Sequence, residues 1–209
     1  ATNLTLRNLR IHGFKAHDAN GIFGTDANTG TLRMENIELF DNGGGNGPEH
    51  NIYIGASKSD PNFTVHMTGS YSHDAYYGHL FKSRAQKNIL EGNYFRGGVG
   101  GAQQAENYLV DVPNGGALTM RNNVLVKNAS GDFSNGLMVT FKMEGTADTR
   151  PDSITIEHNT FVAHSLYYDS QQHQLAPFSF FYPQKNPAAA DFPVANVKVR
   201  GNAFIGLCQ

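Results

Sequence analysis

The chain of 209 residues has one cysteine, no tryptophan and no excess of either charge. Its 16 Lys and Arg residues face 18 Asp and Glu residues, which gives a formal net charge of −2. Proteins that bind nucleic acid or an anionic membrane carry a basic patch, so this balance predicts neither kind of partner. The single Cys208 cannot make an internal disulfide, and cysteine usage leaves the cellular compartment open.

Long apolar runs are missing as well. No run of 18 apolar residues occurs, so we expect no membrane-spanning helix. The start, Ala1-Thr-Asn-Leu4, has neither an initiator Met nor the apolar core of a signal peptide, and we expect a fragment or processed part of a longer chain. What is abundant is Gly and Asn, with 23 and 21 residues, which favour turns and left-handed backbone over long helices.

The sequence contains an irregular internal repeat. A short alternating strand is followed by Asn and then by an apolar residue, and a degenerate copy at 65–71 lacks the Asn. The step between copies varies, from 28 residues between Asn8 and Asn36 to 36 residues between Asn123 and Asn159. The repeated residues are Asn8, Asn36, Asn93, Asn123, Asn159 and Asn202, with the apolar partners Ile11, Leu39, Phe95, Leu125, Phe161 and Phe204.

A second extended segment lies between successive Asn strands. These segments cover residues 21–24, 51–54, 79–82, 108–111, 137–141 and 178–182. Period-2 alternation bounded by Gly, Asn and Asp indicates strands, and their separation excludes two-residue hairpins. Stacking each strand on its equivalent one coil later predicts an all-β fold: a right-handed parallel β-helix, or single-stranded β-solenoid, of about six to seven coils, with residues 1–209 as one domain.

The repeated Asn residues are predicted to be scaffold. A corner between two sheets needs a residue that tolerates the left-handed α region, and the Asn amide can also bond to the coils above and below. The apolar partners should stack in the core.

This coil pattern resembles right-handed parallel β-helix proteins of the pectin-lyase-like superfold, especially bacterial secreted polysaccharide-active members. The resemblance implies a secreted protein, extracellular or periplasmic, that acts on or binds carbohydrate. The same fold hosts lyases, hydrolases, epimerases and inert adhesins, so it does not fix the chemistry. Exposed terminal coils normally need caps, and we expect missing chain or another subunit to cover them.

Ionisable side chains concentrate in the middle of the chain. Aligning the second strands places Ile52, Leu80 and Leu109 inward, and it places Asn51, His79 and Tyr108 at equivalent outward positions. Strict alternation then points Lys82 and Asp111 inward. Either these two close the strand end as a buried ion pair, which is costly to desolvate, or the strand ends first and both reach a surface groove.

The segment Lys82-Ser83, leading to Asn88 and Gly92-Asn93, resembles the Lys-Ser segment of the alginate lyase and chondroitinase B family. The resemblance implies that Lys82 is the catalytic base. That family carries an Arg-His pair in the next coil, whereas here residues 109–114 read Leu-Val-Asp-Val-Pro-Asn. The identity of the acid therefore stays open among Arg84, His79 and Tyr53.

We favour an enzyme, a polysaccharide lyase acting on an acidic, uronic-acid-containing polymer, or a related C5-epimerase. Such an enzyme neutralises the uronate carboxylate, removes the adjacent proton and, in a lyase, protonates the leaving oxygen. Lys82 or His79 would remove the proton, and Tyr53 or His50 would protonate the leaving oxygen. Arg84 is also predicted to be catalytic: together with Asn114 it would hold the uronate carboxylate. The predicted substrate-binding residues are His73, Asn51, Tyr108, Asp111 and Asn114.

Three alternatives stay open. A hydrolase would need paired carboxylates, for which Asp111 and Glu144 are the nearest candidates. A non-catalytic glycan-binding, adhesin or tail-spike-like module would use the same cluster only to bind. No His spacing typical of a metal site occurs, so we predict none; Ca²⁺ bound by Asp74, Asp111 or Glu144 is the one cofactor considered.

Overall fold

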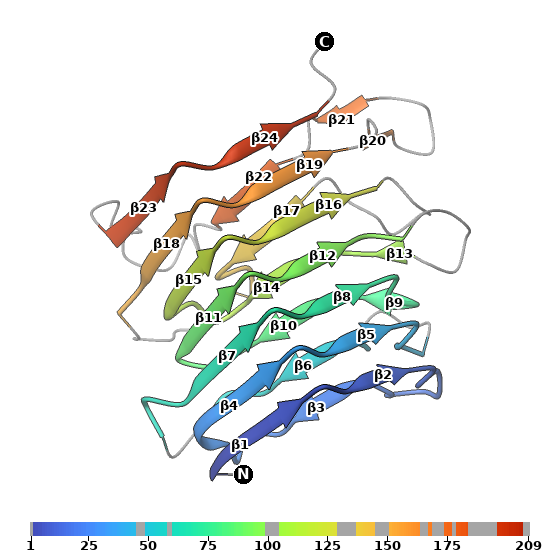
Figure 1. The fold of residues 1–209 in the computed structure, drawn as a ribbon, viewed down its shortest axis with the longest axis vertical. Coiled ribbons are helices and arrows are strands. Elements are labelled where there is room, and N and C mark those ends of the chain that lie inside the picture. Colours follow the sequence, from blue (N-terminus) through green and yellow to red (C-terminus); the bar gives the residue numbers. More distant parts are fainter. Residues whose placement is uncertain are drawn as a thin grey trace.

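The fold is a parallel β-helix in which the chain winds through three sheets. The computed structural model describes residues 2–44, 49–57, 60–98, 105–128, 137–144, 151–163, 167–168, 174–176, 179–183 and 196–206. No α-helix occurs within these residues. Successive coils stack from the N-terminus to the C-terminus (Figure 1), and every strand of the three large sheets runs parallel to its neighbours. The parallel β-helix of about six to seven coils predicted from the sequence is confirmed.

Each of the first six coils supplies one strand to sheet A, one to sheet B and one to sheet C, and the described part of the seventh supplies one to sheet A and one to sheet B. Sheet A contains β1 (Thr2–Arg7), β4 (Thr29–Glu35), β7 (Thr64–Thr68), β11 (Lys87–Glu91), β15 (Ala117–Arg121), β18 (Ser153–Glu157) and β23 (Val197–Arg200). Sheet B contains β2 (Arg10–His12), β5 (Glu38–Phe40), β8 (Tyr71–His73), β12 (Tyr94–Arg96), β16 (Val124–Lys127), β19 (Thr160–Ala163) and β24 (Ala203–Ile205). Sheet C contains β3 (Ile22–Gly24), β6 (Ile52–Ile54), β10 (Phe81–Ser83), β14 (Val110–Val112), β17 (Leu137–Phe141) and β22 (Ser179–Pro183).

Two small pairs lie outside these sheets. β9 (Tyr77–Gly78) pairs in parallel with β13 (Ala105–Glu106), and β20 (Tyr167–Tyr168) pairs with β21 (Gln174–Ala176) in antiparallel fashion. The last predicted strand, 178–182, is found as β22, although residue 178 itself and Cys208 lie outside the described residues.

A left-handed residue makes the corner between sheets A and B in every coil. The corner residue is Asn8, Asn36, Gly69, Gly92, Asn122, His158 or Gly201, and each has φ between 52° and 64°. Gly and Asn tolerate this conformation best, which explains why they recur at the corner. The repeated sequence segment is therefore two strands joined by a bend, and each of the first six coils adds a third strand in sheet C.

The predicted Asn ladder separates into two groups. Asn8 and Asn36 are corner residues themselves and bond to each other across the surface, Nδ2 to Oδ1 at 2.7 Å. Asn93, Asn123, Asn159 and Asn202 come one residue after the corner and point inward. Treating all six as one ladder was wrong. In Asn8-Leu9 the Asn is the corner residue, whereas in Gly92-Asn93 the Gly is the corner residue and the Asn follows it.

The inward Asn residues replace backbone hydrogen bonds at the corner. The Oδ1 of Asn123 accepts the backbone N–H of Asn93 at 2.9 Å, and Asn159 does the same for Asn123. Each Nδ2 donates to the next amide oxygen as well, for example from Asn123 to Asn159 at 2.9 Å. In the first three coils the equivalent residues are Leu9, Ile37 and Ser70, so the amide ladder begins only at the fourth coil, where Asn93 Oδ1 accepts the N–H of Ser70.

The core is filled by inward side chains of all three sheets. Sheet A contributes a methionine-rich row, sheet B the predicted apolar partners and sheet C two aliphatic and aromatic rows; the fully buried members include Met34, Met67, Leu39, Phe95, Leu125, Ile52, Phe81, Val110 and Phe141. The predicted stack is thereby confirmed, although Phe204 in the last coil is exposed on its open side while stacking on Phe161 at 5.4 Å.

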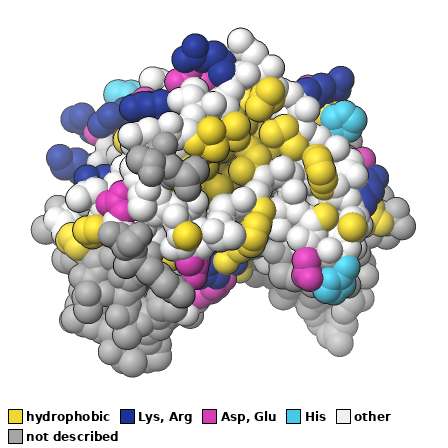
Figure 2. Space-filling model, turned by 90° about the horizontal axis from the view of Figure 1, so that it is seen from below, with side chains coloured by type: hydrophobic (Ala, Val, Ile, Leu, Met, Phe, Trp, Pro, Cys, Tyr) yellow, Lys and Arg dark blue, Asp and Glu magenta, His cyan; other side chains and the backbone are white. Residues whose placement is uncertain are grey.

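The N-terminal end of this core is open. Figure 2 looks onto that end and shows hydrophobic side chains gathered around its hollowed centre. Leu4, Leu9, Phe14 and Phe23 are exposed there, and Phe23 reaches 59%. A cavity of about 130 Å³ lies among Leu4, Leu6, Ile22, Phe23, Leu32 and Phe63. The expectation that another segment or subunit covers this end stays a prediction.

Candidate functional site

The candidate site lies on the outward face of sheet C. The strand register aligns Tyr53 with Lys82, Lys82 with Asp111, and Asp111 with Thr140. Phe81 and Val110, which directly precede Lys82 and Asp111, are fully buried in the core. Strict alternation pointed Lys82 and Asp111 inward, and this was wrong, because the sequence alignment was shifted by one residue between the coil of β6 and the coil of β10. The ion pair that was one of the two alternatives is nevertheless present: both side chains are buried and lie 3.5 Å apart.

A stack of three rings borders this row. His50, His79 and Tyr108 occupy equivalent positions, with centroid separations of 4.5 Å and 4.7 Å. The backbone N–H of His79 donates to Nδ1 of His50, and the N–H of Tyr108 donates to Nδ1 of His79. Because each Nδ1 acts as an acceptor, each neutral ring carries its proton on Nε2.

Burial keeps both imidazoles neutral. It lowers the pKa of His50 to about 3, with Lys82 and Arg84 adding to the effect. Burial also lowers the pKa of His79 well below its usual value. A neutral His79 whose only lone pair already accepts a backbone N–H cannot also accept a substrate proton. This geometry removes His79 as a general base and leaves its Nε2–H as a donor.

Two basic side chains converge on one carboxylate. Lys82 Nζ donates to Oε1 of Glu144 at 2.5 Å, and Arg84 Nη2 donates to Oε2 of the same group. Burial opposes ionisation of Glu144, but the hydrogen bonds from Lys82 and Arg84 outweigh it and lower the pKa of the carboxyl. A carboxylate bound through both oxygens by two cations is the arrangement expected of a site that recognises carboxylates.

Other donors and acceptors fix the guanidinium from its remaining sides. Arg84 Nε donates to the Tyr53 hydroxyl at 3.0 Å, and Nη1 donates to Asn114 Oδ1 at 2.6 Å. Arg84 directly follows β10, and Asn114 follows β14 in the next coil. The fork of Arg84 is therefore oriented independently of Glu144.

Asp111 is the buried carboxyl of the cluster. Its Oδ1 accepts the Thr140 hydroxyl at 2.8 Å, and its Oδ2 lies 3.5 Å from both Lys82 Nζ and His79 Nε2. Burial raises the pKa of Asp111 to about 6 against the attraction of Lys82. With the pKa of Glu144 lowered, the two carboxyls that contact Lys82 differ in proton affinity, an arrangement suited to acid–base chemistry.

The structure brings together eight of the ten predicted site residues: His50, Tyr53, His79, Lys82, Arg84, Tyr108, Asp111 and Asn114. The other two, Asn51 and His73, lie outside this cluster. Asn51 is buried in the interior, where Nδ2 donates to the Ser72 hydroxyl and to the carbonyl oxygen of His73. The His73 ring lies on sheet B, stacked on Phe40 and Tyr71, with Nδ1 2.6 Å from Asp74 Oδ2.

The carboxyl groups considered for Ca²⁺ do not converge. Asp74 pairs with Arg96 on sheet B, whereas Asp111 and Glu144 share the Lys82 ammonium, which stands where a cation would lie. A different group lies closer together: His17, Asp18 and Glu49 place one ligand atom each within 4.8 Å of one another. These residues could hold a divalent cation, but no sequence motif signals them.

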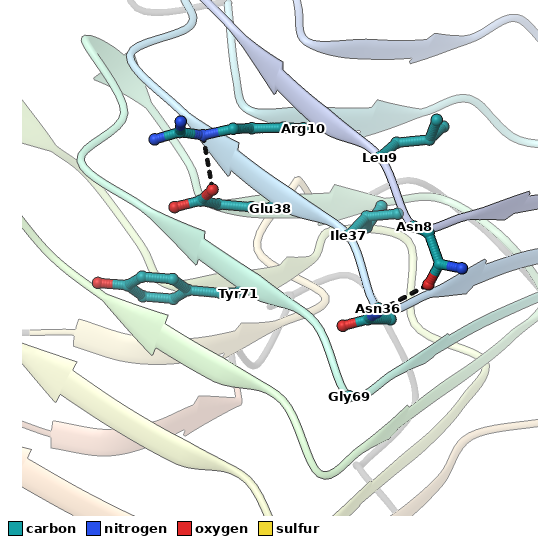
Figure 3. A pocket seen from close by; sticks show the side chains of 8 residues that line it. All are labelled: Asn8, Leu9, Arg10, Asn36, Ile37, Glu38, Gly69 and Tyr71. Atoms are coloured by element: carbon teal, nitrogen blue, oxygen red, sulfur yellow. Dashed lines mark hydrogen bonds and ion pairs between the residues drawn. The ribbon is translucent and has the colours of Figure 1, made fainter.

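A surface cavity of about 340 Å³ lies elsewhere, at the corner between sheets A and B (Figure 3). Its polar side chains are paired with each other: Arg10 with Glu38 at 2.7 Å, and Asn36 with Asn8. Leu9 and Ile37 form its apolar part, where later coils carry the amide ladder. None of the predicted site residues lines it.

Sequence reasoning missed two members of the cluster on sheet C. Thr140 was not named, although Val139-Thr140-Phe141 repeats the apolar–polar–apolar pattern of Val110-Asp111-Val112 one coil earlier. Glu144 was considered only as a Ca²⁺ ligand or hydrolase carboxylate. Its contact with residues 60 and 62 positions away has no signal in the local sequence.

Comparison of the chain with protein-family models, with curated proteins and with solved structures gives no match. The resemblance to the alginate lyase and chondroitinase B family therefore stays a prediction from the sequence. Within the described part of the chain, no helix has the length and hydropathy needed to cross a membrane.

Proposed function

We propose that the outward face of sheet C binds a uronic-acid polysaccharide and cleaves it by β-elimination. The observation that supports this most is the carboxylate of Glu144 held between Lys82 and Arg84. A uronate presents the same functional group, and neutralising it is the first requirement for removing the adjacent proton. Arg84 and Asn114, which already lie 2.6 Å apart, would hold that carboxylate.

Lys82 is the base in this proposal. His79 has no lone pair to offer, because its Nδ1 accepts the N–H of Tyr108. An ammonium cannot act as a base, but Asp111 Oδ2 lies 3.5 Å from Lys82 Nζ and can take its proton. Because its pKa is raised to about 6, Asp111 accepts a proton more readily than an ordinary carboxylate, and it is still mostly ionised at neutral pH.

The reaction then balances without a co-reactant. The free amine of Lys82 takes the proton from C5 of the uronate, and the electrons of that bond form a double bond to C4. The bond from C4 to the bridging oxygen breaks, and this oxygen takes a proton from the Tyr53 hydroxyl. That hydroxyl accepts a hydrogen bond from Arg84 Nε at 3.0 Å, which stabilises the phenolate that forms. A C5-epimerase would use the same abstraction and return the proton to the opposite face.

The resemblance of the Lys82-Ser83 segment to alginate lyases and chondroitinase B agrees with this assignment, since it also makes Lys82 the base. A substrate of this kind implies a secreted or periplasmic protein of the pectin-lyase-like type.

The test is incubation of the protein with alginate, pectate and a panel of glycosaminoglycans. Ultraviolet absorbance of the unsaturated uronate should rise with at least one of them, and a neutral glucan should give no signal. Proton NMR of the recovered polymer detects epimerisation. Neither product from any acidic polymer would contradict the proposal.

A second candidate function is glycan binding without chemistry. It is favoured by the closed ion-pair network, because Lys82 and Asp111 are both buried and every cation of the cluster already contacts a carboxylate. Retarded migration of the protein in a gel containing an acidic polymer, with no unsaturated product, would support this function over the lyase.

A further inference from the structure

Glu144 differs from its partners in where it is attached. Lys82 is in the middle of β10 and Arg84 follows that strand directly, whereas Glu144 lies in the turn after β17. The side chain of Glu144 is 40% exposed, against 10% for Lys82 and 18% for Arg84. Its backbone N–H makes a long bond, 3.4 Å, to the carbonyl of Pro113. The cations thus belong to the rigid sheet and the carboxylate to its periphery.

Neither cation depends on Glu144 for its position. Asp111 lies beside Lys82 Nζ from the buried side, and Tyr53 and Asn114 hold Arg84. Withdrawing the carboxylate of Glu144 would leave one ammonium donor and one guanidinium donor aimed at the same small volume. Both cations would keep their other partners but lose the carboxylate that bridges them, so this volume favours another anion.

Asp111 shows what a permanent partner looks like in the same cluster. It is 2% exposed, it comes from the strand next to β10, and the Thr140 hydroxyl fixes its second oxygen. A substrate cannot replace such a group without opening the sheet. Glu144 can move into solvent by rotating its side chain.

We propose that Lys82 and Arg84 form a binding subsite for a single carboxylate and that Glu144 is its resident ligand, displaced when the carboxylate of a uronate enters. The inference rests on the proposed function and adds its regulation: the protein carries its own competitor for the substrate carboxylate. Lys82 binds the entering carboxylate as an ammonium; transfer of its proton to Asp111 then frees the amine to act as the base and leaves Arg84 and Asn114 to hold the carboxylate.

The apparent affinity of the parent is the intrinsic affinity of the subsite multiplied by the fraction of molecules in which Glu144 does not occupy it. If Glu144 occupies the subsite about nine-tenths of the time, removing it should tighten binding about tenfold. The ligand must be anionic, because an uncharged sugar cannot replace the ion pairs that it breaks.

The experiment compares the parent protein with Glu144→Gln by calorimetric titration against sodium galacturonate, sodium acetate and uncharged galactose. The matched control is Glu35→Gln, which removes the same charge from a surface pair with Arg7. We expect Glu144→Gln to bind galacturonate and acetate each at least about tenfold more tightly than the parent, with acetate the weaker ligand of both proteins, and galactose to bind neither protein. Glu35→Gln should bind as the parent does.

Each outcome bears on one of the two proposals. No gain by Glu144→Gln for either anion overturns the inference, whether or not the parent cleaves a polymer. A gain for acetate without one for galacturonate supports the carboxylate subsite and counts against a uronate substrate. If Glu144→Gln melts far below Glu35→Gln, Glu144→Asp replaces it: the shorter carboxylate cannot bridge both cations, so an intermediate gain is expected and parent-like binding overturns the inference.

Discussion

Two lysine–glutamate pairs in this molecule have opposite surroundings. Lys127, at the end of β16, lies 3.3 Å from Glu106 of β13, and both side chains are fully buried. Burial lowers the pKa of Lys127 and raises the pKa of Glu106, so the interior works against both charges. Lys82 and Glu144 lie closer, 2.5 Å apart, but there the pKa of the carboxyl is lowered and the carboxylate is partly exposed.

The difference lies in what else each pair binds. Lys127 Nζ also donates to the backbone carbonyls of Glu106 and Asn107, and Glu106 Oε2 accepts the N–H of Gly98. Such a pair ties loops to the coil stack and is enclosed. The pair on sheet C contains one partner that solvent can reach. Burial of charge by itself therefore does not distinguish a site from a structural pair, and the exposed partner of Lys82 is what supports the proposed subsite.

The largest effect should come from Lys127→Met. This change leaves the Glu106 carboxylate buried without its ammonium, which costs about 3–5 kcal/mol in comparable cases. Urea unfolding followed by far-ultraviolet circular dichroism measures the loss. Combining Lys127→Met with Glu106→Leu should recover much of it. If Lys82→Met destabilises the protein as much as Lys127→Met, the distinction between the two pairs fails.

The second prediction concerns Asp111, the buried carboxyl beside Lys82. Its folded pKa of about 6 lies above the unfolded value of 3.8, so between these limits the folded protein binds more protons than the unfolded one. Stability from this group is present at low pH and is lost as the pH rises through that window, by roughly 3 kcal/mol for a shift of about two units.

We therefore expect the parent to lose stability relative to Asp111→Asn between about pH 4 and pH 6. Urea midpoints measured at one-unit steps from pH 4 to pH 7 check this. Glu106, whose pKa is also raised, is present in both proteins and cancels from the difference. Parallel profiles would mean that Asp111 does not carry the shift.

Lys82→Met should act on turnover more than on folding. Loss of a general base lowers turnover by at least about 10²-fold, which corresponds to roughly 2.7 kcal/mol of barrier. Stability should fall less than for Lys127→Met, because Asp111 can take up a proton and Glu144 keeps Arg84 as its partner. The matched control is Lys87→Met, an exposed lysine of β11. Equal turnover in the two variants would favour binding or scaffold over catalysis.

The smallest effect should come from the surface pair of Arg7 and Glu35, whose side chains are both solvent-accessible. Glu35→Gln should change the free energy of unfolding by less than about 1 kcal/mol, and less still at high salt. Thermal melts of the parent and of Glu35→Gln at low and high ionic strength measure this reference effect. A larger effect would show that even the exposed pairs of the coil stack are structurally important.

The fold could be predicted because stacking makes each coil repeat its neighbour. Alternating apolar residues and the left-handed corner recur whatever the loop length, and they identify the coils directly. The two groups of Asn could not be separated, since Gly and Asn both satisfy the corner and Asn also satisfies the ladder. Only the position of the positive φ distinguishes Asn8 from Asn93.

The sequence predicted which residues gather at the candidate site better than it predicted which way their side chains point. β6, β10 and β14 have three residues each, so alternation within one strand contains a single outward residue and fixes the phase poorly. The error on Lys82 and Asp111 followed from this. His73 was misplaced because the stretch 71–84 passes from sheet B to sheet C, and proximity in sequence did not mean a shared face.

The late start of the amide ladder has a consequence for how the stack opens. From Asn93 onward each corner is joined to the next by two bonds to a side-chain amide oxygen, one from the backbone N–H and one from Nδ2. The earlier corners have one side-chain bond each, from Asn36 Nδ2 to Asn8 and from the backbone N–H of Ile37 to the Ser70 hydroxyl. Local unfolding should therefore begin at the N-terminal coils and stop near the fourth. Amide protons of β1, β4 and β2 should exchange with solvent sooner than those of β11 and β15. The stack would then fray from one end.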